Sequence, residues 1–179
     1  MRRECMEIRT ANKEDFSELL SFYNRMCSVL GEQDFLPEGD KGGFPSEEMI
    51  RESIAAKVQF VGIEDEKIIA AYIIDHNCDP AYHSVQWQIN TKTEEVMILH
   101  ALRVLPEYSR RGYSKQLVRH AIQISKEMGQ KAIRLDCIEG NDIPQKMYQS
   151  LGFQYIDSVR ITYPDIGTPK KFLLYEILL

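Results

Sequence analysis

The chain has 179 residues, of which 44% are hydrophobic and 27% charged, and its formal net charge is −5. This length suits one globular domain with a sizeable core, so we expect a single domain over residues 1–179, with 1–5 as a flexible N-terminal extension. No apolar run approaches the roughly 18 residues that a membrane-spanning helix needs. The excess of 27 acidic over 22 basic residues argues against a nucleic-acid-binding face.

The four cysteines stand far apart, with no Cys-x-x-Cys pair and no His/Cys cluster at metal-ligand spacing. Neither a metal site nor a disulfide framework is predicted. Scattered cysteines are typical of a reduced, cytoplasmic protein. The basic N-terminal residues are not followed by an apolar stretch, so they do not predict a secretion signal.

Hydrophobic periodicity predicts the elements of the first half. They are a strand at 6–9, a helix at 16–30, a Gly/Pro-containing loop at 32–45, a helix at 46–57 with Ser46 as its N-cap, and a hairpin of strands at 58–63 and 68–74. Residues 75–92 show no clear pattern.

In the second half, strands and helices alternate. The predicted elements are a strand at 96–104, a helix from about 111 to 128, a strand at 132–137, a helix capped by Asn141 or Asp142, and strands at 153–163 and 171–178. Strand–helix–strand–helix–strand implies a mixed α/β sheet with a parallel crossover in the middle. In such sheets, ligands bind beyond the carboxyl ends of strands, where helices begin.

The sequence Ser-Arg-Arg-Gly-Tyr-Ser-Lys at 109–115 links a predicted strand to a predicted helix. A loop of this kind presents free backbone N–H groups at a helix N-terminus, where phosphate binds. Arg110, Arg111 and Lys115 favour a polyanion such as a pyrophosphate. Because Gly112 stands alone, neither GxxxxGK[ST] nor GxGxxG fits.

Three segments stand together at characteristic spacings: Val-Leu-Pro at 104–106, Ser-Arg-Arg-Gly-Tyr-Ser at 109–114, and Asn141, Tyr148 and Leu-Gly-Phe at 151–153. With them the chain resembles the GNAT superfamily of acyl-CoA-dependent N-acetyltransferases. Ser109 and Ser114 depart from that family's Q/R-x-x-G-x-G/A pattern. The resemblance implies a GNAT-like α/β fold, with a mixed, mostly antiparallel sheet of about seven strands flanked by about four helices.

The resemblance also implies acetyl-CoA as co-substrate, without a metal. Amides of the basic loop would bind its pyrophosphate, and the main chain at 102–104 would pair with pantetheine like an added strand. Asn141 would hydrogen-bond the pantetheine arm, or serve simply as a helix N-cap. The implied coenzyme-binding residues are Leu102, Arg103, Val104, Ser109, Arg110, Arg111, Gly112, Tyr113, Ser114, Lys115 and Asn141.

Acetyl transfer to an amine needs a proton acceptor for the amine and a proton donor for the departing thiolate. His100 is the candidate base, in a strand similar to that of arylalkylamine N-acetyltransferases, with Ile98 where these carry a second histidine. Tyr148 stands at the position of the family's general acid. The alternatives are a core histidine and a packed aromatic, with Glu94 and Glu95 as substitute bases.

Four aromatic residues of the irregular segments are candidate walls of an acceptor site, or else loop anchors packed on the core: Phe35, Phe44, Tyr82 and Trp87. Such walls would suit an arylalkyl or otherwise amphipathic amine, with Asp75 or Asp79 holding its ammonium group.

The leading prediction is therefore an N-acetyltransferase that acts on a primary amine of a small molecule, by direct attack within a ternary complex. A protein or peptide N-acetyltransferase and a non-catalytic acyl-CoA-binding regulatory module are the alternatives. The sequence leaves open whether the chain forms a homodimer.

Overall fold

The computed structural model describes residues 6–35, 44–164 and 166–179. The expected extension at 1–5 and much of the predicted loop at 32–45 lie outside them. Within the described residues, seven strands form one sheet in the order β1-β2-β3-β4-β5-β7-β6. The strands are β1 (Glu7–Thr10), β2 (Gln59–Glu64), β3 (Lys67–Asp75), β4 (Val96–Val104), β5 (Ala132–Ile138), β6 (Gln154–Ile161) and β7 (Lys170–Leu178).

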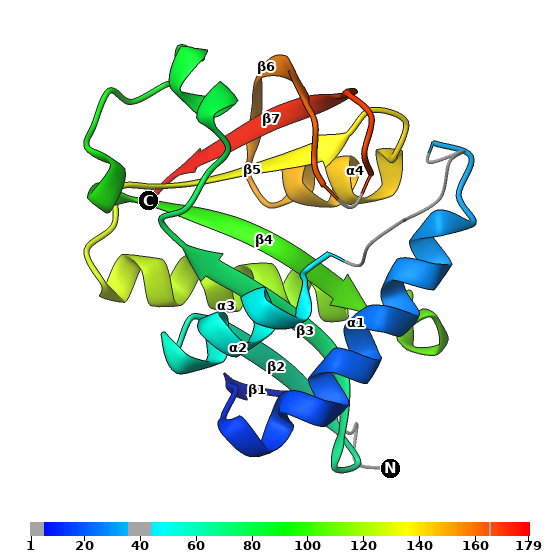
Figure 1. The fold of residues 1–179 in the computed structure, drawn as a ribbon. Helices are drawn as coiled ribbons and strands as arrows, with labels where there is room; N and C mark the ends of the chain where they lie inside the picture. Colours follow the sequence, from blue (N-terminus) through cyan, green and yellow to red (C-terminus); the bar gives the residue numbers. More distant parts are fainter. Residues whose placement is uncertain (1–5, 36–43, 165) are drawn as a thin grey trace.

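Four α-helices in the described part of the chain flank this sheet (Figure 1). They are α1 (Phe16–Gly31), α2 (Glu47–Ala55), α3 (Tyr113–Glu127) and α4 (Asp142–Ser150). Helices α1 and α2 lie on one face, and α3 and α4 lie on the other (Figure 1). Only the β4–β5 pair is parallel among the described strands. The predicted mixed, mostly antiparallel sheet is thus confirmed. None of the described helices is long and apolar enough to cross a membrane.

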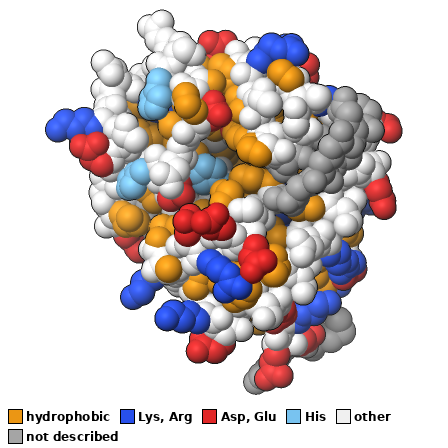
Figure 2. All heavy atoms as spheres, viewed as in Figure 1, with side chains coloured by type: hydrophobic (Ala, Val, Ile, Leu, Met, Phe, Trp, Pro, Cys, Tyr) orange, Lys and Arg blue, Asp and Glu red, His pale blue; other side chains and the backbone are white. Residues whose placement is uncertain are grey.

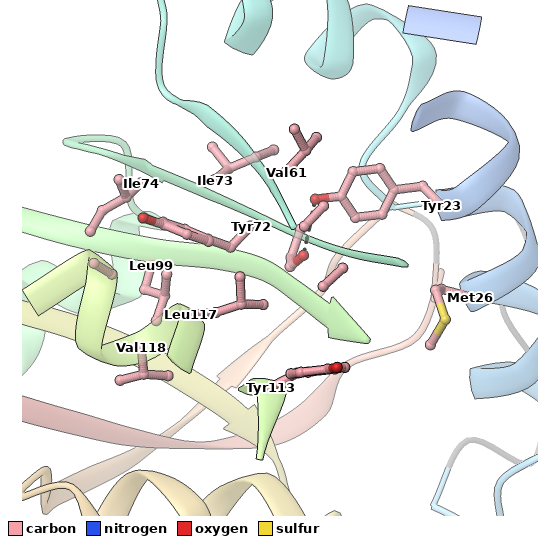
Figure 3. Close-up of a cluster of buried hydrophobic side chains, with 14 of the residues drawn as sticks. Tyr23, Met26, Val61, Tyr72, Ile73, Ile74, Leu99, Tyr113, Leu117 and Val118 are labelled. Carbon is pink, nitrogen blue, oxygen red and sulfur yellow. Dashed lines mark hydrogen bonds between the residues drawn. The ribbon is translucent and has the colours of Figure 1, made fainter. Parts of the chain in front are cut away.

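Strand β3 lies in the middle of the core, with side chains buried on both faces. The Tyr72 hydroxyl lies 2.7 Å from Nδ1 of His120 on α3, so Tyr72 faces α3. Because side chains alternate along a strand, Ile73 and its partner on β4, His100, face the opposite side, where α1 packs. Figure 3 shows the buried cluster around these strands, with Leu117 and Val118 contributed by α3 and Tyr23 by α1.

Strands β4 and β5 separate after a short stretch of pairing. They pair at 96–98 with 132–134, and then β4 continues to Val104 and β5 to Ile138 without further pairing between them. The register between β3 and β4 shifts opposite Tyr72, where Ala101 has a φ of 50°. A bulge of this kind bends a strand. The sheet therefore opens between β4 and β5, on the side where α3 and α4 begin.

The structure differs in detail from two predictions at these helix starts. The helix expected from about residue 111 begins at Tyr113, because Arg110 and Gly112 have φ values of 62° and 81°, which an α-helix does not accommodate. At α4, Asn141 stands at the N-cap position, but no side-chain cap forms among the described residues. Its ψ of 78° departs from the extended backbone that usually lets an N-cap side chain reach the first helical amides.

Candidate active site

A cavity of about 930 Å³ lies where β4 and β5 part. Its lining comes from β4, the loop before α3, β5, α4 and the residues around the start of β7. Figure 2 shows hydrophobic side chains gathered in a hollow on one face, bordered by histidine and acidic side chains. The cavity therefore joins most of the predicted coenzyme-binding residues to the predicted base and acid.

The basic loop forms one end of this cavity. Ser109, Arg110, Gly112, Tyr113, Ser114 and Lys115 line it. Gly112 at the N-cap of α3 has no side chain with which to cap the first-turn amides, and a Cβ there would meet nothing within 4 Å. Uncapped amides at a helix N-terminus, with Arg110 and Lys115 beside them, fit a diphosphate.

Arg111 is placed differently from the other predicted residues of the loop, because it is absent from the cavity lining. Its Nη1 lies 3.1 Å from Oε1 of Glu64 on β2, and its guanidinium lies 4.9 Å from the centre of the Tyr108 ring. The hydroxyl of Tyr113 donates a short hydrogen bond to the other oxygen of Glu64. Glu64 is buried and ties both ends of the Arg111–Gly112–Tyr113 turn to the β2–β3 hairpin. No sequence pattern predicts these contacts, because Glu64 is separated from Arg111 by 47 residues and from Tyr113 by 49 residues along the chain.

Tyr148 on α4 reaches the cavity between the separated strands. Its side chain is buried, and its ring packs edge-on against Phe153 with centroids 5.4 Å apart. Burial raises the pKa of Tyr148 above its usual value, and no described residue hydrogen-bonds the hydroxyl. A protonated phenol without a partner is suited to donate to a group bound in the cavity.

The remaining predicted coenzyme contacts also line the cavity: Leu102, Arg103, Val104 and Asn141. The first three belong to the part of β4 that has left its pairing with β5. The side chain of Asn141, which does not cap α4, is left available for a ligand.

His100 enters the cavity from β4. Its Nε2 lies 2.9 Å from Oδ1 of Asp75. Burial would raise the pKa of Asp75, but hydrogen bonds from His100 and Asn77 together with the His100 charge hold it below its usual value. An ionised Asp75 accepts the Nε2 proton, which leaves Nδ1 of a neutral imidazole as a proton acceptor.

Among the other acidic candidates, Asp79 and Glu95 bind other residues, and Glu94 does not line the cavity. Asp79 caps a 3-10 turn at Pro80–Ser84 by accepting from the amide of Ala81 at 2.9 Å. Glu95 pairs with Lys131 at 2.7 Å, and neither Glu94 nor Glu95 lines the cavity.

The structure adds a carboxylate that was not predicted, Asp136 on β5, to the cavity lining. The hydroxyls of Tyr82 and Tyr163 both donate to its Oδ2 at 2.7 Å. Burial raises the pKa of Asp136 despite these two hydrogen bonds. In the sequence, Asp136 is one of two charged residues in an otherwise apolar strand, and its partners Tyr82 and Tyr163 lie 54 and 27 residues away.

The four predicted acceptor-wall aromatics do not lie together. Phe44 lines the cavity and packs 6.0 Å from the Tyr163 ring. Phe35 packs against the turn before α4, since a Cβ on Gly140 would lie 3.0 Å from its own Cβ. Tyr82 and Trp87 line a second cavity of about 520 Å³, where Arg134 stacks 4.3 Å from the Trp87 ring.

In the comparison with protein families, the model described as the acetyltransferase (GNAT) family matches residues 21–153. No curated protein matches the sequence.

Solved structures share the fold over nearly the whole chain. A GNAT-family acetyltransferase from Streptococcus agalactiae 2603 superposes with a TM-score of 0.75 at 19% identity, covering 97% of this chain and 95% of its own. One from Streptococcus pneumoniae gives 0.71 at 18% identity, with 98% and 100% covered. A ribosomal-protein-alanine N-acetyltransferase from Brucella melitensis gives 0.70 at 14% identity, with 97% and 99% covered. At these identities the likeness shows the fold.

Proposed function

The chain belongs to the GNAT acetyltransferase family, and from this premise we propose that it transfers the acetyl group of acetyl-CoA to a primary amine of a small-molecule acceptor. One observation carries the proposal: a single cavity contains the basic loop, Tyr148 and His100. This arrangement supports a reaction in which the diphosphate is bound at one end of the cavity and the proton donor and acceptor act in the same space, as direct transfer within a ternary complex requires.

The amides at the start of α3, with Arg110 and Lys115, hold the diphosphate of the coenzyme. The separated part of β4 and Asn141 position its pantetheine arm. His100, oriented by Asp75, accepts a proton from the acceptor amine at Nδ1, so that the neutral amine attacks the acetyl carbonyl carbon. Tyr148 donates its hydroxyl proton to the sulfur as the carbon–sulfur bond breaks, so the products are an N-acetylated amine and free coenzyme thiol.

The test is an acetyl-CoA assay that measures free thiol against a panel of primary amines, with the product identified by mass spectrometry. We expect thiol release that matches N-acetylated product in amount. If the protein binds acetyl-CoA but no amine or peptide elicits thiol release, the proposal fails in favour of a non-catalytic acyl-CoA-binding module.

The second candidate acceptor is the N-terminal amine of a peptide or protein. A structural neighbour named as a ribosomal-protein-alanine N-acetyltransferase favours it. Short peptides that begin with alanine belong in the same panel, and turnover of these peptides in preference to small amines would support this second candidate.

We also propose a cytoplasmic location, since Cys78 and Cys137 are free thiols.

A further inference from the structure

We propose that the carboxylate of Asp136 binds the ammonium group of the acceptor, and that the acceptor is a cationic amine with an apolar body. This inference rests on the proposed acetyltransferase function. It also moves the ammonium site away from Asp75 and Asp79, whose carboxylates are engaged by His100 and by the turn at Pro80–Ser84.

The first support is the place of Asp136 in the sheet. The last paired residues of β4 and β5 are Ile98 and Arg134, and His100 and Asp136 each lie two residues further on. Side chains two residues apart in a strand share a face. His100 and Asp136 therefore emerge on the same side of the sheet, where the strands part. An amine between them would contact the base and the carboxylate together.

The second support is the unbalanced hydrogen bonding of the carboxylate. Both phenols donate to Oδ2, while no described residue donates to Oδ1. Asp136 lines the cavity, so Oδ1 is the oxygen left for a ligand. A carboxylate oxygen that faces a cavity without a protein donor is free to accept from a ligand group bound there.

The third support is the lack of a protein cation. Among the described residues, other poorly exposed acids have one: Glu176 pairs with Arg134 at 2.7 Å and Glu64 with Arg111 at 3.1 Å. No described lysine or arginine forms an ion pair with Asp136, whose hydrogen-bond partners are two neutral phenols. The charge of His100 lowers the pKa of Asp136, but His100 forms its ion pair with Asp75 and not with Asp136. Buried charges are ordinarily paired, so a substrate ammonium group would supply the ion pair that the described residues do not.

The fourth support is the apolar lining around this carboxylate. Tyr163, which binds Asp136, packs 6.0 Å from Phe44 and 5.0 Å from Phe172. Ile166 and Phe172 share a buried cluster with Tyr82, against which Leu30 and Tyr163 pack, and Leu30, Tyr163, Ile166 and Phe172 also line the cavity. One fixed negative charge among hydrophobic side chains matches an amine whose single charged group is attached to an apolar body.

A purely structural role for Asp136, as a tie between Tyr82 and Tyr163, makes a different prediction, and the Asp136→Asn variant separates the two. Its side-chain carbonyl still accepts from both phenols, while the negative charge is lost. The matched control is Asp157→Asn on β6, which makes the same substitution at an exposed position that the cavity lining does not include. Circular dichroism checks that both variants fold.

The probes are 2-phenylethylamine and 2-phenylethanol, which share a carbon skeleton and differ in charge. Their binding to the protein saturated with coenzyme A is measured by isothermal titration calorimetry at pH 7. We expect the wild-type protein to bind the amine, and Asp136→Asn to weaken amine binding by about 10- to 100-fold. Binding of the uncharged alcohol should change by less than about 2-fold, because the substitution removes only the charge of the site. Asp157→Asn should change the binding of neither probe.

The inference is overturned if the wild-type protein does not bind the amine, if Asp136→Asn binds it as tightly as the wild type does, or if that variant weakens amine and alcohol alike. Because this titration involves no acetyl transfer, it is independent of the thiol assay. If the thiol assay detects turnover of amines but Asp136→Asn weakens the binding of both probes equally, the proposed function stands and Asp136 has no part in recognising the ammonium group.

Discussion

Tyr148 and His100 reach the reacting centre from opposite faces of the sheet. Tyr148 comes from α4, on the face that α3 and α4 cover, whereas His100 shares its face with Ile73, on the side of α1 (Figure 1). In the proposed reaction one proton leaves the amine on the α1 side, and another enters the sulfur on the α4 side. The two roles are therefore separable by substitution.

Replacing Tyr148 with Phe keeps the ring that packs against Phe153 and removes the proton donor. We expect kcat to fall by about 100-fold or more, because the departing thiolate must leave unprotonated. The KM for acetyl-CoA should stay within about 3-fold, since the loop that binds the diphosphate is untouched. Steady-state kinetics measure both constants, and an unchanged kcat would exclude Tyr148 as the acid.

Replacing His100 with Gln removes the proton acceptor and keeps a polar side chain of similar length. We expect kcat/KM to fall by about 10- to 100-fold near pH 7. The loss should shrink as the pH is raised toward 9, because more of the amine is then already neutral. A pH–rate profile of wild type and variant provides the measurement. A deficit that is the same at every pH would point to a different base.

At the scale of elements, the start of α3 depends on a contact from β2, which lies two strands from β4 in the sheet. Arg110 and Gly112 adopt positive φ values that open the loop toward the cavity. Glu64 on β2 holds the loop there through Arg111 and Tyr113. The geometry of the diphosphate end therefore depends on a hairpin that does not itself line the cavity.

The variant Glu64→Gln removes the charge that pairs with Arg111 and keeps an acceptor for Tyr113. We expect the KM for acetyl-CoA to rise by about 3- to 10-fold with little change in kcat, since the variant perturbs the position of the loop and not the reacting groups. Arg111→Gln should have a similar effect, and the double variant should be less impaired than the product of the two single effects, because both break one contact. Fully multiplicative effects would show that Glu64 and Arg111 act independently.

The elements with strong periodicity could be predicted from the sequence. Helix α1 and the β2–β3 hairpin were predicted correctly, because the pattern of each is local and each buries one clear set of side chains. The start of α3 was misplaced by two residues, since a non-glycine residue such as Arg110 gives no sign that its φ is positive. Asn141 stands at the predicted N-cap position of α4, but its side chain does not cap the helix, because residue type alone does not determine the backbone conformation there.

The candidate site could be predicted where it follows from motifs on one continuous segment, as in the loop before α3. Asp136 was not predicted, because its place in the site depends on hydrogen bonds from Tyr82 and Tyr163, which are close to it only in the folded chain. For the same reason, Tyr82 and Trp87 were grouped with Phe44, although they line a different cavity.

For the molecule as a whole, the proposed ammonium site has a cost in stability. The pKa of Asp136 is raised by burial, so the folded chain binds this proton more tightly than the unfolded chain does. For a carboxyl with a raised pKa, the folded state is favoured below the unfolded value, and this contribution is lost as the pH rises through the folded value. At neutral pH the carboxylate therefore destabilises the fold.

Asp136→Asn should consequently raise the melting temperature at pH 7, by about 2–6 °C, while it impairs amine binding. The gain should narrow as the pH is lowered toward 4, where the wild-type carboxyl is increasingly protonated. Differential scanning calorimetry across this pH range measures the effect. A melting temperature below that of the wild type at pH 7 would show that the carboxylate stabilises the fold.

Trp87 is the only tryptophan in the chain, and its ring centroid lies 5.5 Å from that of Tyr82. Tyr82 in turn donates to Asp136, so a single tyrosine joins the indole to the proposed ammonium site. We expect an amine that binds Asp136 to change the intrinsic fluorescence of the protein, and Tyr82→Phe to diminish this signal. The enzyme would thus carry its own optical reporter of acceptor binding, with no added dye or label.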